Sequence, residues 1–346
     1  MATVDLTVRG AGIFGLGIAW EALRRGARVR VVDPVGPGAG ASGGVVGALA
    51  PHTPDGWNEK KQFQLESLLM AEAFWAEIAA VSGMATGYGR TGRLQTLADA
   101  RSVHLAEARE AAAAERWGGA ATWRVVDAGA WTWAPVSPTG RLVHDTLSAR
   151  LDPARAVAAT AAAIRTAGGE IVAEAPDEGA VVWATGWSGL EELSRALGRP
   201  VGGGVKGQAL LLCAAVPEDA PQLFVDGLHI VPQIGGHVAI GSTSENAFGD
   251  PFSVDAHLDL LHERAVAALP VLHGAPVVRR WAAVRPRART RAPLLGPWPG
   301  RPGHFVANGG FKIGFGIAPR VAQVMADLVL EGRETYPAAF RVENSV

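Results

Sequence analysis

The chain has 346 residues, 48% of them hydrophobic, and a formal net charge of −1 at pH 7. This composition supports a sizeable core in one large domain or two. The near-neutral charge and the lack of a basic block argue against a partner bound through nucleic-acid phosphates. The only cysteine, Cys213, cannot form an intrachain disulfide. No signal peptide precedes the first predicted strand, and no apolar run approaches the ~20 residues that span a bilayer, so we expect a cytoplasmic protein without a membrane partner.

Residues 4–33 predict a strand, a glycine turn, a helix and a second strand. Gly10, Gly12 and Gly15 form a Gly-x-Gly-x-x-Gly pattern, and Asp33 ends the second strand. In such a unit the glycines let the backbone approach a pyrophosphate at the helix N-terminus, and the acid accepts hydrogen bonds from ribose hydroxyls. A dinucleotide-binding unit is the interpretation, with a glycine turn of purely packing origin as the alternative.

The first half of the chain continues with helices and short strands. After a loop at 34–57, apolar positions three and four residues apart predict an amphipathic helix over 59–81 and another over 105–117. Residues 118–140 predict mixed strand and loop. Asp152 and Pro153 suit the start of a helix over 152–167. A short strand at 170–174 and a buried strand within 179–186, ending in a small-residue turn, follow.

The second half begins with alternating strands and turns. Strands are predicted at 207–213, 224–231, 237–241 and 277–284, a helix at 255–269 and a loop at 285–302. A last core strand at 303–307 leads into a glycine-rich turn at 309–316 and a helix at 317–330. Strand–helix units at the beginning, middle and end should share one parallel sheet, and the two strand-rich insertions should form a second, antiparallel sheet.

The expected fold class is therefore α/β, in two interleaved parts. A Rossmann-like cofactor domain with a parallel sheet is expected to comprise residues 1–80, 141–203 and 284–346. A smaller α+β substrate domain with an antiparallel sheet is expected at residues 81–140 and 204–283.

Six segments, in order along nearly the whole chain, resemble the D-amino acid oxidase superfamily of flavoproteins. They are residues 10–52, 181–188, 200–208, 230–243, 280–297 and 309–319. Within that superfamily the motifs resemble those of bacterial glycine oxidases and, at the C-terminal loop, those of sarcosine oxidases. The resemblance implies FAD rather than NAD. Cys213 lies outside the loop where sarcosine oxidases tether their flavin, so noncovalent FAD is expected.

The resemblance implies positions for each part of the cofactor. The glycine turn and the loop after Asp33 would hold the pyrophosphate and ribose, a second loop would lie beside the isoalloxazine, and the C-terminal glycine turn would face the pyrimidine edge, where a positive helix end favours reduction. The chain has only residues 175–179 where the family carries a hairpin, so the adenine end should be open. The cofactor-binding residues implied are Gly10, Gly12, Ile13, Phe14, Gly15, Asp33, Pro34, Ala41, Ser42, Val46, Gly47, Ala48, Val172, Ala184, Gly186, Gly309, Gly310, Phe311, Ile313 and Gly314.

Four residues are candidates for the substrate side. Arg285 lies where the family has the arginine that binds the substrate carboxylate, and the two-pronged guanidinium matches the two oxygens of a carboxylate. The alternative is a surface arginine. Lys312 would join Arg285 or tune the flavin, or be a solvated cation. His229 replaces the usual pocket tyrosine, or is a satisfied core histidine. His52 is expected to face the flavin ring. An apolar residue usually precedes the first glycine of the pattern, and the sequence does not explain why Arg9 stands at this position.

The function implied by the resemblance is oxidation of a small amino acid or secondary amine. A hydride would pass from Cα to flavin N5, giving an imine, and O2 would reoxidise the flavin and yield hydrogen peroxide. One alternative is a dealkylating oxidase for a larger substrate, similar to the oxidase half of the tRNA wobble-uridine modifying enzyme. Another is an FAD dehydrogenase that uses a different electron acceptor. No metal site is expected, and the oligomeric state stays open.

Overall fold

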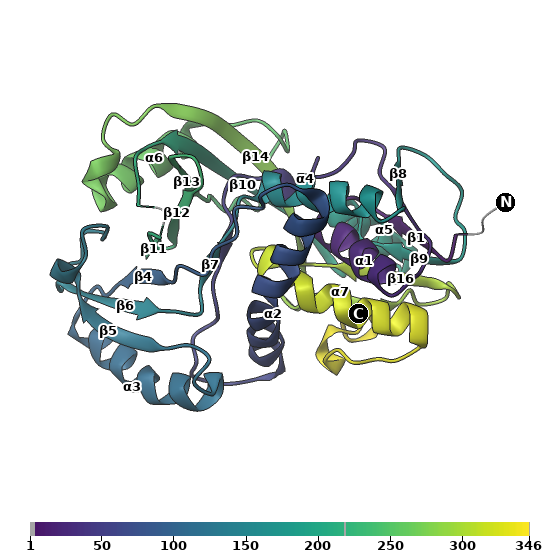
Figure 1. The fold of residues 1–346 in the computed structure, drawn as a ribbon, viewed down its shortest axis with the longest axis horizontal. Coiled ribbons are helices and arrows are strands. Elements are labelled where there is room, and N and C mark those ends of the chain that lie inside the picture. The colour runs from purple at the N-terminus through teal and green to yellow at the C-terminus, as the bar shows by residue number, and fades with distance from the viewer. Residues whose placement is uncertain (1–3, 218, 346) are drawn as a thin grey trace.

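The computed structural model describes residues 4–217 and 219–345, and it contains two large β-sheets that meet along one side (Figure 1). One sheet has six strands in the order β15-β16-β9-β1-β2-β8, and the other has eight in the order β14-β10-β13-β12-β11-β4-β6-β5. The first is parallel except at one edge, and the second is almost entirely antiparallel. The expected α/β class with one parallel and one antiparallel sheet is confirmed.

The six-stranded sheet brings together segments from the beginning, middle and end of the chain. Strand β15 is its antiparallel edge, paired with β16. Helices α1, α2, α4 and α7 pack against one another beside this sheet. The strands are β1 (Leu6–Arg9), β2 (Val29–Val32), β8 (Glu170–Val172), β9 (Ala180–Trp183), β15 (Leu294–Pro297) and β16 (His304–Asn308); the helices are α1 (Ile13–Arg24), α2 (Glu59–Ser82), α4 (Pro153–Thr166), α5 (Gly186–Ala196) and α7 (Gly314–Glu331).

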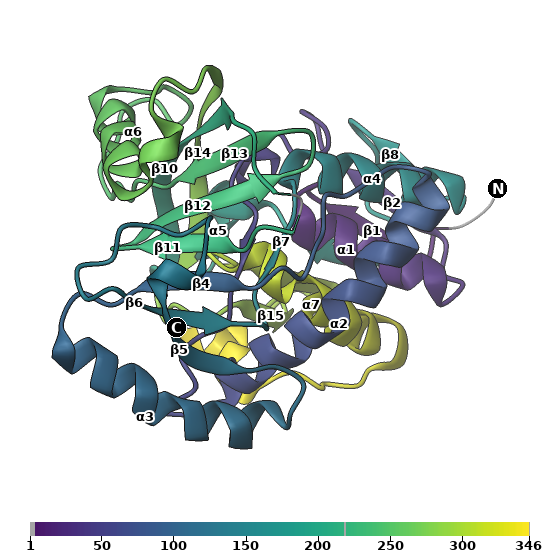
Figure 2. The ribbon, with the colours of Figure 1, turned by 60° about the vertical axis from the view of Figure 1, so that its left-hand side comes forward.

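The eight-stranded sheet is built from the two predicted insertions together with residues 141–145, 202–203 and 284–288. Its one parallel pairing joins β11 to β4, the point where the two insertions meet. Figure 2 shows α3 lying along β5 and α6 beside β10 and β14 at the other end of the sheet. The strands are β4 (Arg93–Thr96), β5 (Trp123–Asp127), β6 (Arg141–Asp145), β10 (Gly202–Cys213), β11 (Gln222–Val225), β12 (Leu228–Gln233), β13 (His237–Gly241) and β14 (Val277–Ala288); the helices are α3 (Ala100–Trp117) and α6 (Ala256–Ala268), and β3 (Ala48–Leu49) pairs separately with β7 (Ala149–Arg150).

The helix boundaries follow from capping residues. The Asn58 side chain accepts a hydrogen bond from Lys61 N at the start of α2, and Gly83 ends that helix in the left-handed conformation. Asp99 and Ser102 form a reciprocal capping box, so α3 starts before the predicted 105–117. None of the helices in the described ranges has the length and hydrophobicity to cross a bilayer.

Three differences from the sequence prediction affect the site. Helix α5 follows the predicted small-residue turn, in a stretch for which the sequence predicted no element, and α7 starts at Gly314 rather than at residue 317. The predicted loop at 285–302 is partly wrong, because β14 continues to Ala288 and β15 follows. Pro286 is tolerated within β14 because this strand is an edge of its sheet and needs no N–H on its outer side.

The proposed domain boundaries remain a prediction, and three strands do not follow them. Strand β10 begins at Gly202, before the predicted boundary at 204. Strand β6 begins at the predicted boundary 141 yet pairs with β4 and β5. Strand β14 runs past the predicted boundary 284 while paired with β10. A division that follows the sheets would place β6 and the whole of β10 and β14 in the substrate part.

A buried ion pair within the eight-stranded sheet yields a stability prediction. Arg93 Nε lies 2.9 Å from Asp145 Oδ2, and Asp145 has no exposed surface. Arg93→Met should destabilise the protein by about 3–5 kcal/mol, because it leaves a buried carboxylate unpaired. Urea unfolding measures this. The double variant Arg93→Met/Asp145→Leu should recover most of the loss, and a single variant as stable as the parent would contradict the prediction.

Candidate functional site

A cavity of about 1070 Å³ lies between the two sheets. Its walls come from the carboxyl ends of β1, β2, β9 and β16, the starts of α1 and α7, and strands β10, β12 and β14. The site residues predicted from the sequence that line it are Gly10, Gly12, Ile13, Phe14, Asp33, Pro34, Ala41, Ser42, Val46, Gly47, Ala48, Ala184, Gly186, His229, Arg285, Gly310, Phe311, Lys312 and Gly314.

The glycine turn before α1 has no room for side chains. Gly10 has φ +103°, and a Cβ there would lie 2.4 Å from the carbonyl oxygen of Ala184. A Cβ on Gly15 would lie 1.9 Å from the Gly10 carbonyl oxygen, so Gly15 supports the turn from beneath and does not line the cavity. Gly12 caps α1 without a side chain, and Ser42 Oγ accepts from Ile13 N at 2.9 Å. The first turn of α1 therefore presents amide donors to the cavity.

Asp33 organises the backbone around this turn. Its Oδ2 accepts from Ala11 N at 2.8 Å, and its Oδ1 accepts from Val35 N and Gly36 N, each at 3.0 Å. A carboxylate has about four acceptor positions. With Oδ1 accepting two bonds and Oδ2 one, Asp33 keeps capacity for a further donor such as a ribose hydroxyl.

The start of α7 forms a second amide-rich wall. Ile313 caps α7 without a side-chain hydrogen bond. The Asn308 side chain holds the preceding turn, because it accepts from Gly309 N and donates to the Gly186 carbonyl, each at 2.8 Å. A Cβ on Gly310 would lie 2.8 Å from the Phe14 ring, so the turn packs closely against α1. The positive ends of two helices thus face one cavity, an arrangement that favours an anionic ligand.

Arg9 closes the end of the cavity formed by β2 and β8. It pairs with Asp177 at 2.5 Å and donates to the Ala175 carbonyl at 2.9 Å, which pins the short 173–179 segment across the end of β1. Ala173, Glu174 and Ala175 line the cavity together with Arg9. The structure supplies the role that the sequence analysis could not find for Arg9.

The Arg285 guanidinium is buried beside the cavity and held by neutral oxygens. Its side chain is 9% exposed, and burial lowers its pKa to about 10 although the charge of Glu245 acts to raise it. Nη1 donates to Ser242 Oγ at 2.6 Å, and Nη2 donates to the carbonyl oxygens of Thr243 at 2.6 Å and Lys206 at 3.3 Å. Nε has no partner among the described residues. One buried N–H and the second N–H of Nη1 are left for a ligand.

Phe311 brings Lys312 and Arg285 into the same neighbourhood. The Phe311 ring centroid lies 5.6 Å from the Arg285 guanidinium carbon and 5.8 Å from Lys312 Nζ. Burial and the nearby charge of Arg285 lower the pKa of Lys312. The carboxylates that line the cavity among the described residues are Asp33 and Glu174, both on the β2 and β8 side. The opposite side is therefore positive and suits a carboxylate.

His229 lines this positive side as a neutral imidazole. It lies on β12 with its ring 4.8 Å from the Phe224 ring, and its Nδ1 is buried without a partner. Burial lowers its pKa to about 3, and the charges of Arg93 and Lys312 act in the same direction. A satisfied core histidine would have a partner, so the geometry favours pocket lining.

Four other predicted residues do not line the cavity. His52 is half-buried and its Nδ1 pairs with Gln64 Oε1, so its expected place at the flavin ring is not supported. Val172 pairs with Val32 on the edge strand β8 and does not line the cavity, whereas the next residues, Ala173, Glu174 and Ala175, do. Gly309 and Ile313 lie behind the cavity wall and shape the start of α7.

Some cavity residues were not predicted from the sequence. Ser242, Trp281 and Trp187 lie within the segments that carry the family resemblance, which is the signal that could have found them. Asn308 and Phe224 lie before the recognisable motifs that begin at 309 and 230, so only the assembled sheets show that they line the cavity.

Comparison with known proteins identifies the family of this chain. Residues 5–328 match the family described as DAO, FAD dependent oxidoreductase. The chain belongs to this family, and its cofactor is FAD. This confirms the resemblance and the cofactor expected from the sequence.

Individual relatives fall in the same group. A glycine oxidase of Pseudomonas putida is 36% identical over 168 residues, which cover 48% of this chain but less than half, 44%, of that enzyme. A Rhizobium etli protein that carries the name thiamine biosynthesis oxidoreductase ThiO is 30% identical to this chain. The matched residues cover 94% of this chain and 96% of the Rhizobium protein. The crystal structure of a glycine oxidase from Geobacillus kaustophilus superposes with a TM-score of 0.85 over 98% of both chains, at 23% identity.

Gly207 provides a test of how Arg285 is placed. A Cβ on Gly207 would lie 2.4 Å from Nη2 of Arg285, so Gly207→Ala must displace the guanidinium. We expect the affinity of the FAD-bound protein for acetate to fall on the order of tenfold or more, with FAD content unchanged. Changes in the flavin absorption spectrum on titration measure this affinity. Gly203→Ala, on the same strand with nothing within 4 Å of its Cβ, is the matched control.

The neutral His229 predicts a dependence of stability on pH. Its pKa is about 3 in the folded protein against 6.5 when unfolded, so the unfolded chain binds the extra proton between these values and stability falls as pH decreases. From pH 7 to pH 5 the parent should lose about 2 kcal/mol more than His229→Asn. Urea unfolding of both proteins at the two pH values measures the difference, and equal losses would show that His229 is accessible to protons.

Proposed function

We propose that this protein is an FAD-dependent amine oxidoreductase that removes a hydride from the carbon bearing the nitrogen of a small amine or amino acid with a carboxylate. The observation that carries this proposal is the Arg285 guanidinium. It is buried at the edge of the FAD cavity and keeps a donor without a partner. A buried cation with a free N–H, in a wall without carboxylates, is a site for a carboxylate ligand.

The residues of the six-stranded part fit FAD. The glycine turn at Gly10–Gly12 and the first turn of α1 would hold the pyrophosphate, and Asp33 would accept from the ribose. Val46, Gly47 and Ala48 would lie along the isoalloxazine, and the start of α7 would face its pyrimidine edge. When bound, FAD supplies the hydride acceptor. We propose noncovalent binding, since Cys213 is exposed and does not line the cavity.

The eight-stranded part would orient the substrate. Arg285 and Lys312 would bind the carboxylate and so hold the α-carbon at the flavin-facing side of the cavity. His229, being neutral, can hydrogen-bond the amine without repelling it. The basicity of the amine then decides its protonation state, because none of the described residues on this side of the cavity is a carboxylate that could act as a general base.

The electron acceptor proposed is O2, with hydrogen peroxide as the product. The support for O2 as the acceptor is that several relatives and solved structures similar to this chain are named glycine oxidases. Mixing the FAD-bound protein anaerobically with glycine, sarcosine and D-alanine tests the proposal: one of them should bleach the flavin, and admitting O2 should restore the colour and release peroxide. Bleaching without peroxide would mean a different acceptor, and a flavin that no small carboxylated amine reduces would contradict the proposal.

Arg285→Ala tests the carboxylate role within the same assay. The apparent substrate constant should rise by about 100-fold, in line with the loss of a buried charge-assisted contact of roughly 2–3 kcal/mol, while FAD content is unchanged. Arg289→Ala is the matched control, because Arg289 is exposed and near in sequence. Unchanged kinetics for Arg285→Ala would remove this residue from the site.

A further inference from the structure

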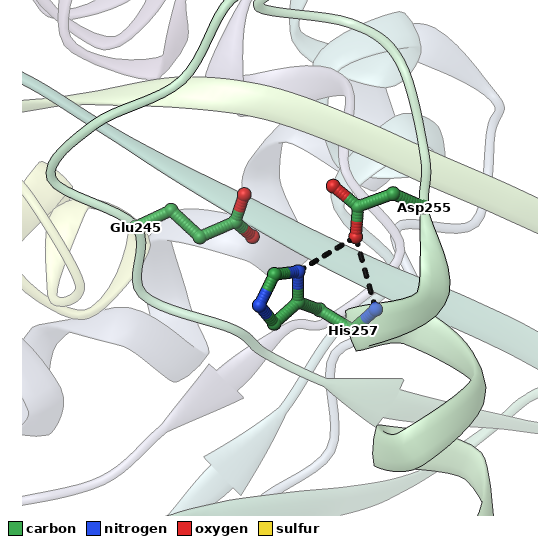
Figure 3. Close-up of side chains that lie close together, drawn as sticks. All are labelled: Glu245, Asp255 and His257. Atoms are coloured by element: carbon green, nitrogen blue, oxygen red, sulfur yellow. Dashed lines mark hydrogen bonds and ion pairs between the residues drawn. The ribbon is translucent and has the colours of Figure 1, made fainter.

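Three ionisable side chains that do not line the cavity lie close together beside the start of α6 (Figure 3). The ligand atoms of Glu245, Asp255 and His257 all lie within 4.8 Å of one another. Glu245 follows β13, Asp255 caps α6 and His257 lies in the first turn of that helix. Asp255 Oδ1 accepts from His257 N at 2.9 Å and from His257 Nδ1 at 2.8 Å.

Gln208 is the centre of this cluster. It lies on β10 with no exposed surface. Its Nε2 donates to Glu245 Oε1 at 3.1 Å and to Asp255 Oδ1 at 2.8 Å, and its Oε1 accepts from Asp255 N at 2.9 Å. One oxygen of each carboxylate, Glu245 Oε1 and Asp255 Oδ1, therefore already accepts hydrogen bonds from neighbouring donors. The cluster is a hydrogen-bonded clamp rather than a metal site.

The clamp holds the segment that binds Arg285. Residues 242–245, here called the anchor segment, supply the acceptors Ser242 Oγ and Thr243 O for the guanidinium. Gln208 N donates to Thr243 Oγ1 at 2.8 Å, and Thr243 N donates to Gln208 O at 3.1 Å. The Thr243 hydroxyl in turn donates to the Glu245 carboxylate. Each end of the anchor segment is thus tied to β10.

Gln208 and Arg285 act from opposite faces of the sheet. The guanidinium lies over Gly207, the residue before Gln208 on β10. Successive residues of a strand point to opposite faces, so Gln208 points to the face away from the cavity, where α6 packs. The anchor segment lies between the two and transmits any displacement of the clamp to the guanidinium.

We propose that Gln208 and Glu245 are positioning residues that fix the Arg285 guanidinium through the anchor segment, so that its free N–H groups face a substrate carboxylate. This inference rests on the proposed function in taking Arg285 as the carboxylate anchor. Burial lowers the pKa of Arg285, and the negative charge of Glu245 acts to raise this pKa and so favours the charged guanidinium. A binding group held within a fraction of an ångström binds more tightly than one that must be ordered by the ligand.

Gln208→Leu tests the proposal, because it keeps the approximate volume and removes the three side-chain hydrogen bonds that join Gln208 to Glu245 and Asp255. In the FAD-bound protein the dissociation constant for acetate, followed by the flavin spectrum, should rise on the order of tenfold. The apparent KM of a carboxylated amine should rise by the same factor with a smaller change in kcat. The apparent KM of an amine without a carboxylate should be unchanged, a selectivity that a general loss of folding would not give.

Two further variants keep the test decisive. Thr243→Val removes only the hydroxyl that links the anchor segment to the clamp, so it should weaken acetate binding even where Gln208→Leu fails to fold. His257→Gln changes the exposed outer member of the cluster and should bind acetate as the parent does.

Acetate binding at parental strength by Gln208→Leu and Thr243→Val would overturn the positioning role, as would equal weakening of the amine without a carboxylate. The acetate titration needs no turnover, so it separates failure of this inference from failure of the proposed reaction. A parent protein that binds no acetate would contradict Arg285 as the anchor and the inference with it.

Discussion

Burial of the Arg285 charge is the constraint on which the substrate side of this structure depends. A guanidinium that is 9% exposed needs oxygen acceptors to replace water. Lys206 on β10 and the residues after β13 supply them. Gly207 leaves the space in which the side chain crosses β10 to reach them. Strands β14, β10 and β13 must therefore lie side by side and in one register for the charge to be tolerated.

The cofactor side satisfies a different constraint, the close approach of main chain to a large anionic ligand. Gly10 and Gly310 sit where a Cβ would collide with backbone or an aromatic ring, and helices α1 and α7 start without side-chain caps. The free amides and the positive helix ends then face the same space. The negative charges of Asp33 and Glu174 stay on the far side from Arg285 and Lys312, so the two ends of the cavity differ in polarity.

Arg9 fixes the connection between β8 and β9. The 173–179 segment that forms this connection contains no helix or strand among its described residues. The Arg9 guanidinium ties it down through Asp177 and Ala175, and Thr7 bonds to the main chain of Glu178. An apolar residue at this position could not make these bonds, which explains a charged residue directly before the first glycine.

The sequence by itself determined the features that depend on local physics. Periodicity predicted the bounds of α2 to within one residue, and the glycine pattern with Asp33 predicted the cofactor turn. Both features depend only on a few neighbouring residues, because helix amphipathicity and the conformational freedom of glycine are local properties. The ordered motifs identified the family, its two-sheet fold and FAD.

Only the tertiary structure decided which residues face the cavity. His52 lies in a recognisable motif yet pairs with Gln64, and Val172 pairs with Val32 on the edge strand β8 without lining the cavity. Arg9, Ser242 and Asn308 do line the cavity. Successive residues of a strand point to opposite faces of the sheet. Which of these faces borders the cavity depends on the register between strands that lie far apart in the sequence. That register arises from burial and hydrogen bonding between segments that the sequence separates by up to hundreds of residues, so no local pattern could specify it.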